Sequence, residues 1–166
     1  MTFSLVLAKL RKCPIKTQYR LKFVTPEDDP GRGIVFLISK DRRVTAKEEF
    51  DGLRENTERH FRSKFDYWLT GKPYPQGYHG WNQNEWQGKY TKCFVFTHDE
   101  KEVAQRFYGF LYNPKPSDRR YHICVLVRYA HKIRHETDET DLKIVEEIRT
   151  SPEVQKAIDE YFKEKP

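Results

Sequence analysis

The stretch RRYHICVLVRYAHK, residues 119–132, decides how this sequence is interpreted, because basic residues flank a continuous apolar run. In a β-strand, successive side chains point to opposite faces of the sheet. One alternating set is apolar or aromatic and is predicted to face the core: Tyr121, Ile123, Val125, Val127 and Tyr129. The other set mixes charged with small apolar side chains and is predicted to face a groove or solvent: Arg120, His122, Cys124, Leu126 and Arg128.

Basic and acidic residues follow this strand in two separate groups. The basic group consists of His131, Lys132, Arg134 and His135, and the acidic group of Glu136, Asp138, Glu139 and Asp141. Carboxylates near the beginning of a helix offset the helix dipole, so the acids are predicted to start a helix. The bases have two interpretations, namely a solvated strand-to-helix loop and a strand-end site for an anionic substrate.

Two further strands are predicted upstream, over residues 90–98 (YTKCFVFTH) and 104–113 (AQRFYGFLYN). Short polar connections separate the three strands, which is typical of an antiparallel meander. Arg106 is expected on the same side of its strand as Tyr108 and Phe110.

Helices are predicted before and after this meander. An aromatic stripe recurs at three- and four-residue steps between Phe50 and Leu69 and is predicted to be the core face of a helix, after a capping-box pattern formed by Thr45 and Glu48. Two C-terminal helices are expected, the second beginning at Ser151 and Pro152. With short strands near the N-terminus, the fold class is α+β: a mainly antiparallel sheet, a helix pair before the three-strand meander, and two C-terminal helices.

The segment 71–89, GKPYPQGYHGWNQNEWQGK, is long for a loop without structure of its own. Its tryptophans, Trp81 and Trp86, have two interpretations. They form a platform on which bases stack, or they pin the loop onto the core.

Composition limits the class of protein. A chain of 166 residues suits a single domain, 1–166, and a net charge of +6 favours RNA, DNA, anionic lipid or an acidic protein as partner. The three cysteines are far apart and no metal-ligand spacing occurs, so we expect no metal and no cofactor. The motifs of nucleoside-triphosphate, dinucleotide and zinc-protease sites are absent, and no apolar run is long enough to cross a membrane. We therefore expect a cytoplasmic protein without a membrane partner.

The basic side chains and aromatic rings together indicate a site for a phosphodiester. Arginine offers a bidentate fork to phosphate, histidine exchanges protons near neutral pH, and tyrosine and tryptophan stack on bases. The predicted RNA-binding residues are Arg120, His122, Arg128, Arg134, Trp81 and Trp86. The alternative is a solvated basic face of the sheet.

In its order of helix pair, three antiparallel strands and closing helix, the chain resembles the RelE/ParE toxin superfamily, in particular its HigB-like branch. The resemblance covers residues 34–150 and rests on GKYTKCFVF, RFYGFLY and HICVLVRYAHKIRHETD. Lys132 and Thr137 match a lysine and a threonine of the family's basic segment, whereas Ile133 and Asp138 replace its second lysine and its proline. Residues 1–33 are then an N-terminal extension, and residues 151–166 an extra C-terminal helix.

The resemblance implies a metal-independent mRNA endoribonuclease, commonly dependent on the ribosome, in which the RNA's own 2′-OH attacks. Such a reaction requires a base, an acid and a cation for the developing charge. The implied catalytic residues are Arg106 for the charge, Lys132, His131 or His135 for protons or phosphate, and Tyr108 or Tyr129 for stacking or proton transfer. An acidic antitoxin is the implied protein partner.

Two other hypotheses remain open at this point. One is a non-catalytic module on the same scaffold that binds nucleic acid or protein. The other is an unrelated nucleic-acid-binding domain that uses Trp81, Trp86 and Tyr90 for stacking. The position of Arg106 distinguishes the catalytic from the non-catalytic hypothesis, because an ion pair within the protein would make its charge unavailable for catalysis.

Overall fold

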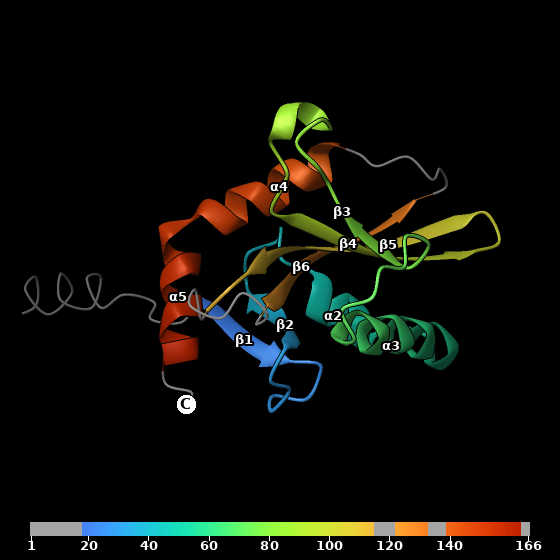
Figure 1. Cartoon of the computed structure of the whole chain (residues 1–166), viewed down its shortest axis with the longest axis horizontal. Helices are drawn as coiled ribbons and strands as arrows, with labels where there is room; N and C mark the ends of the chain where they lie inside the picture. Colours follow the sequence, from blue (N-terminus) through green and yellow to red (C-terminus); the bar gives the residue numbers. More distant parts are fainter. Residues whose placement is uncertain (1–17, 115–121, 133–138, 164–166) are drawn as a thin grey trace, which may run out of the picture.

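The computed structural model of the chain describes residues 18–114, 122–132 and 139–163, with only the backbone of Lys132 (Figure 1). Six strands form one sheet in the order β1-β2-β6-β5-β4-β3. The strands are β1 (Tyr19–Phe23), β2 (Arg32–Ser39), β3 (Tyr78–Gly80), β4 (Cys93–Glu100), β5 (Val103–Tyr112) and β6 (His122–Lys132). All neighbours are antiparallel except β2 and β6, which are parallel. The predicted α+β class and the antiparallel meander β4-β5-β6 are confirmed.

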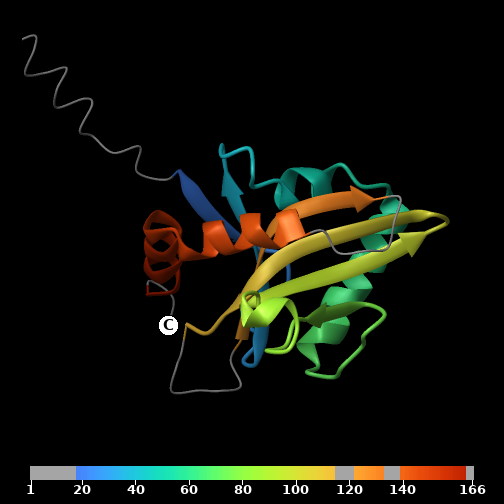
Figure 2. The ribbon, with the colours of Figure 1, turned by 90° about the horizontal axis from the view of Figure 1, so that it is seen from above.

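The described residues form four α-helices, which cover both faces of the sheet. They are α2 (Ala46–Asp51), α3 (Glu55–Leu69), α4 (Glu139–Thr150) and α5 (Pro152–Lys163). In Figure 1, α2 and α3 lie below the sheet and α4 lies above it. The view from above shows α4 crossing the strands (Figure 2). The sheet is therefore the middle layer between two helical layers.

Both faces of β6 are core, which corrects the predicted division into a core face and an open face. Cys124 and Leu126 are fully buried, as are Val125 and Val127 on the other side. Cys124 and Leu126 pack in the cluster beneath α2 and α3, whereas Val125 and Val127 pack in the cluster beneath α4 and α5. A strand covered on both sides becomes a continuous apolar run, because neither alternating set meets water.

A β-bulge then changes the faces near the end of β6. The register shifts at Tyr108 and Gly109 of β5, where Gly109 lies opposite Leu126 and Tyr108 opposite Arg128. A Cβ atom on Gly109 would lie 2.2 Å from the carbonyl oxygen of Val125, so this close approach requires glycine. Tyr129 consequently packs in the cluster of α2 and α3, on the side opposite to its predicted neighbour Val127.

The aromatic stripe of α3 is core, as predicted. Phe61, Phe65 and Trp68 are buried on one side of the helix. Phe61 meets Phe107 edge-on with ring centroids 4.8 Å apart, and Phe65 meets Phe96 in the same geometry. Edge-to-face contacts of this kind add to the hydrophobic burial that holds α3 on the sheet.

The predicted capping contact of Thr45 is wrong. Its side chain makes no capping hydrogen bond to α2. Instead, the Thr45 hydroxyl accepts a hydrogen bond from the backbone N–H of Tyr129 at 3.0 Å, and its own N–H donates to Val127 O at 2.9 Å. The pairing of β2 with β6 ends at Leu126. Beyond that point, Thr45 provides the hydrogen-bond partners for the backbone of β6.

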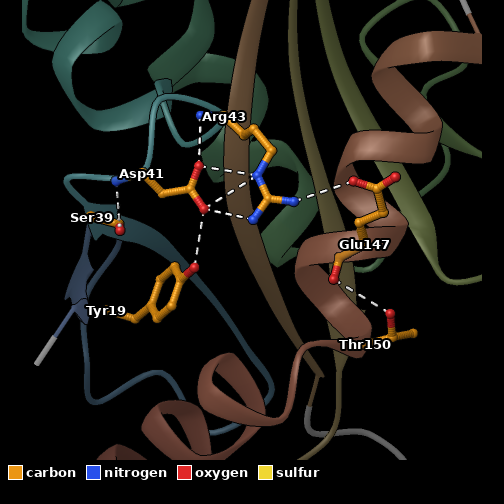
Figure 3. A network of polar contacts seen from close by, with 6 residues as sticks. All are labelled: Tyr19, Ser39, Asp41, Arg43, Glu147 and Thr150. Carbon is orange, nitrogen blue, oxygen red and sulfur yellow. Dashed lines mark hydrogen bonds and ion pairs between the residues drawn. The ribbon is translucent and has the colours of Figure 1, made fainter. Parts of the chain in front are cut away.

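A polar network ties three separate segments together (Figure 3). Arg43 donates to both carboxylate oxygens of Asp41 and also to Glu147 of α4, while the Tyr19 hydroxyl of β1 donates to Asp41 at 3.1 Å. The hydrogen bonds from Arg43 lower the pKa of Asp41 to about 2. The network therefore links β1 and the segment after β2 to α4.

Candidate functional site

The predicted strand-end arginines lie on one face of the sheet, but both are paired with acids. Arg106 Nη1 lies 2.6 Å from Asp99 Oδ1, and the Arg106 side chain is only 11% exposed. Arg128 Nε lies 2.8 Å from Asp141 Oδ1, in the first turn of α4. Each guanidinium therefore already has an anionic partner within the protein.

Two of the aromatic residues proposed for stacking are part of the core. Tyr108 is 1% exposed and Trp81 is 7% exposed, and their rings stack with centroids 6.4 Å apart. Because both rings are buried, neither offers an exposed face to a base. This corrects the predicted roles of Tyr108 with substrate and of Trp81 as a base platform, and it shows that Trp81 pins its loop to the sheet.

Trp86 differs, since 40% of its surface is exposed. It opens the 3₁₀ turn η1 (Trp86–Gly88) with a φ of 50°, in the left-handed region. Its ring meets Tyr90 edge-on at 6.3 Å, and the Tyr90 hydroxyl donates to Glu139 at 2.8 Å. The ring of Trp86 is thus held outward.

The remaining predicted catalytic residues do not join Arg106. His131 is exposed and lies opposite Gln105 on β5, so it points to the face opposite to that of Arg106. The side chains of Arg120, Lys132, Arg134 and His135 lie outside the described residues. Among the side chains that are described, the predicted catalytic set does not converge on one point.

One predicted RNA-binding residue, His122, does line a pocket. This pocket has a volume of about 400 Å³ and lies at the end of the sheet where β6 begins. Its floor is formed by four side chains on adjacent strands: Arg32, His122, Leu111 and Phe94. Trp68, Tyr78, His79 and the loop 71–75 also line it.

Strand pairing brings the two basic residues of the floor together. Arg32 lies directly opposite His122 in the parallel pairing of β2 with β6. Both therefore point to the face covered by α3, on which Ile34 and Cys124 are the next buried pair.

The wall loop takes its shape from glycine and proline. Gly71 ends α3 with a φ of 79°, which glycine adopts without steric cost. Pro73 and Pro75 restrict the backbone on either side of Tyr74. A Cβ atom on Gly77 would lie 2.2 Å from the Tyr74 ring, so this glycine lets Tyr74 pack down beside the pocket.

Among the described residues, the pocket lining is basic and contains no acid. The described lining includes Arg32, Lys72 and His122, with His79 at the rim, but no aspartate or glutamate. Arg32 lies over the Trp68 ring, with its guanidinium carbon 4.6 Å from the ring centroid, and Nη1 donates to Trp68 O at 3.1 Å. Within the described part of the chain, no carboxylate forms an ion pair with Arg32, Lys72 or His122.

Burial affects the charged and the aromatic groups of the pocket differently. Burial lowers the pKa of Arg32, although a guanidinium stays charged at neutral pH, and burial raises the pKa of Tyr78. The Tyr78 hydroxyl donates to the backbone oxygen of Lys72, which fixes its ring in the wall. His79 reaches only the rim, since its ring meets Trp81 at 5.1 Å on the other side of the sheet.

The sequence carries only part of the signal for this site. Aromatic and basic residues alternate with proline in GKPYPQGY, residues 71–78, which the composition predicts to be a loop. Arg32 follows a turn-rich segment and has no local feature that sets it apart. Its contact with His122 depends on the parallel pairing of β2 and β6, which local periodicity does not reveal.

Comparison of the chain with protein-family models, with curated proteins and with solved structures finds no match. Within residues 18–114, 122–132 and 139–163, no helix is long and apolar enough to cross a membrane. In the same part of the chain, no three histidine, cysteine, aspartate or glutamate side chains gather in a way that could hold a metal ion.

Proposed function

We propose that this protein is a non-catalytic binding module for single-stranded nucleic acid, and that the pocket receives one nucleotide. The observation that carries the proposal is Arg32, a partly buried guanidinium without a carboxylate partner among the described residues, which lies beside His122 in a pocket whose described lining contains no acid. The phosphate contacts Arg32 and His122, and the base lies against the aromatic wall.

Charge supports an anionic ligand. A guanidinium has five N–H donors, and the only acceptor that Arg32 has for them among the described residues is Trp68 O. Partly buried charges normally have a partner, because removal from water is costly. A phosphate would accept two parallel hydrogen bonds from such a fork.

The aromatic wall supports a flat group next to that anion. Trp68, Tyr74, Tyr78 and Phe94 all line the pocket, but the first, third and fourth are buried, so Tyr74, which is 39% exposed, is the ring on which a base stacks. Bases stack on aromatic rings with little dependence on sequence, because every base has a π-face. The volume of about 400 Å³ is near the lower end of ligand sites, which favours one nucleotide over a larger group.

The ribonuclease activity implied by the RelE-like pattern stays a prediction. It requires Arg106 to leave Asp99, and it requires proton-transfer groups from outside the described residues. Binding needs no such rearrangement at the pocket, which is why we favour a binding module.

The test is the affinity for a short labelled single-stranded RNA, measured by fluorescence anisotropy. Arg32→Gln should weaken binding about tenfold or more, because a hydrogen bond to a charged group is worth about 1.5–3 kcal/mol. Arg62→Gln is the matched control: Arg62 also lies over an aromatic ring, that of Phe50, but outside the pocket and beside Glu58. It should leave the affinity within about twofold, since surface ion pairs contribute little.

Equal weakening by both substitutions, or no binding by the wild type, would refute the proposal. The same samples are followed for RNA length over time. Cleavage that is lost in Arg106→Ala would instead support the endoribonuclease.

A further inference from the structure

An exposed pair of tyrosines adjoins the pocket. Tyr67 and Tyr74 are 41% and 39% exposed, and with Trp86 they are the exposed large hydrophobic side chains of the described residues. The Tyr67 and Tyr74 rings meet edge-on with centroids 5.4 Å apart. Both also contact the ring of Tyr78, at 6.4 Å and 6.2 Å. Because Tyr74 and Tyr78 line the pocket, the three rings form a continuous aromatic path from its wall to the surface.

We propose that Tyr67 is a second base-binding position, so that the protein binds two consecutive nucleotides of a single strand. This inference rests on the proposed function of the pocket, which holds the first nucleotide. The second base stacks on Tyr67 outside the pocket. Lys72, which lines the pocket, supplies a positive charge for the backbone of the strand.

The tyrosine pair is positioned by the backbone around it and by the contacts of its rings with each other and with Tyr78. Tyr67 belongs to the last turns of α3, and its carbonyl accepts a hydrogen bond from the Thr70 hydroxyl at 2.5 Å. Tyr74 sits between two prolines and packs against Gly77. A tyrosine already fixed in position loses little conformational entropy on binding.

Two bases side by side identify the ligand as a strand rather than a free mononucleotide. A single nucleotide would fill the pocket and would not reach the ring of Tyr67. A second base adds stacking that alanine substitutions in other proteins value at about 1–3 kcal/mol, which corresponds to about five- to 150-fold in affinity. The ligand chemistry is a base next to a phosphate, which RNA and single-stranded DNA share.

The experiment compares uridine 3′-monophosphate with a dinucleotide that carries the same 3′-phosphate, by calorimetric titration of the full chain. Two further dinucleotides each lack one base, one at the first position and the other at the second. They carry both phosphates but a single base, so they separate the effect of the added phosphate from that of the added base. The wild type should bind the intact dinucleotide at least about fivefold tighter than the mononucleotide, and the abasic forms should lose that gain. Deoxy versions show whether the 2′-OH contributes.

Substitutions locate the second base. Tyr67→Leu keeps an apolar contact with Tyr74 but removes the ring. The higher affinity for the dinucleotide should therefore vanish, while the affinity for the mononucleotide stays the same. Tyr67→Phe should keep the gain. Loss of the gain in Trp86→Leu but not in Tyr67→Leu would place the second base at the other exposed aromatic and refute the inference.

Failures at the two levels give different results. If the wild type binds the mononucleotide and the dinucleotide equally well, the second position is refuted but the proposed function stands. If neither ligand binds, the pocket itself is not a nucleotide site and both proposals fall.

Discussion

Replacing Gly109 by alanine tests the β-bulge that sets the faces of β5 and β6. The added Cβ would lie 2.2 Å from Val125 O, 2.9 Å from Val125 C and 3.0 Å from the Leu126 Cα. All three are backbone atoms of the central strand, so no side chain can rotate away to make room. Overpacking of a core typically costs about 1–3 kcal/mol, and a clash with backbone places this substitution at the upper end, about 3 kcal/mol.

Urea unfolding followed by circular dichroism measures this loss. The matched control is Gly52→Ala, where the nearest atoms would be 3.7 Å from the Cβ and φ is −90°. This control should be neutral or should stabilise by up to about 1 kcal/mol, because alanine restricts the unfolded chain. A loss below about 1 kcal/mol for Gly109→Ala would refute the close approach of β5 to β6.

Two further predictions concern acid stability and thiol reactivity. Because the pKa of Asp41 is about 2 in the folded protein, against an ordinary value of 3.8, its contribution to stability is present above about pH 4 and is lost as the pH falls towards 2. Asp41→Asn should therefore reduce the difference in urea midpoint between those two pH values, and an unchanged difference would contradict the role of Arg43. Burial raises the pKa of Cys93 to about 12 and also raises that of Cys124, so in a Cys13→Ser protein no thiol should react with Ellman's reagent before unfolding. Rapid labelling of the folded protein would contradict that burial.

Much of the fold could be predicted, because strands and helices leave local periodic patterns. Periodicity alone predicts both the meander β4-β5-β6 and the buried stripe of α3. The start of α5 at Pro152 follows from the favourable first helical position of proline.

The faces of the central strand were harder to assign. An alternating pattern suggested one open face, yet Cys124 and Leu126 belong to the apolar run ICVLV and are as buried as their neighbours. That continuous run was the signal for burial on both sides. The isolated Gly109 within RFYGFLY was the signal for a bulge, after which simple alternation no longer holds.

The site depended most on long-range pairing. The sequence predicts His122 as a ligand-binding residue, but its partner Arg32 reaches it only through the parallel pairing of β2 and β6. Arg106 carries the expected charge, but residue type alone does not show which acid of the β4-β5 turn, Asp99, Glu100 or Glu102, pairs with it. Residue type therefore indicates which side chains could bind a phosphate, and tertiary contacts decide which of them have no carboxylate partner among the described residues.

The most direct test of the central claim is an NMR titration of the isotope-labelled protein with a short single-stranded RNA. A pocket site predicts that the largest shifts cluster at Arg32, His122 and Tyr74, including the side-chain N–H signals of Arg32. Shifts concentrated instead around Arg106 at the β4-β5 hairpin, or shifts spread evenly over the surface, would contradict the pocket as the binding site.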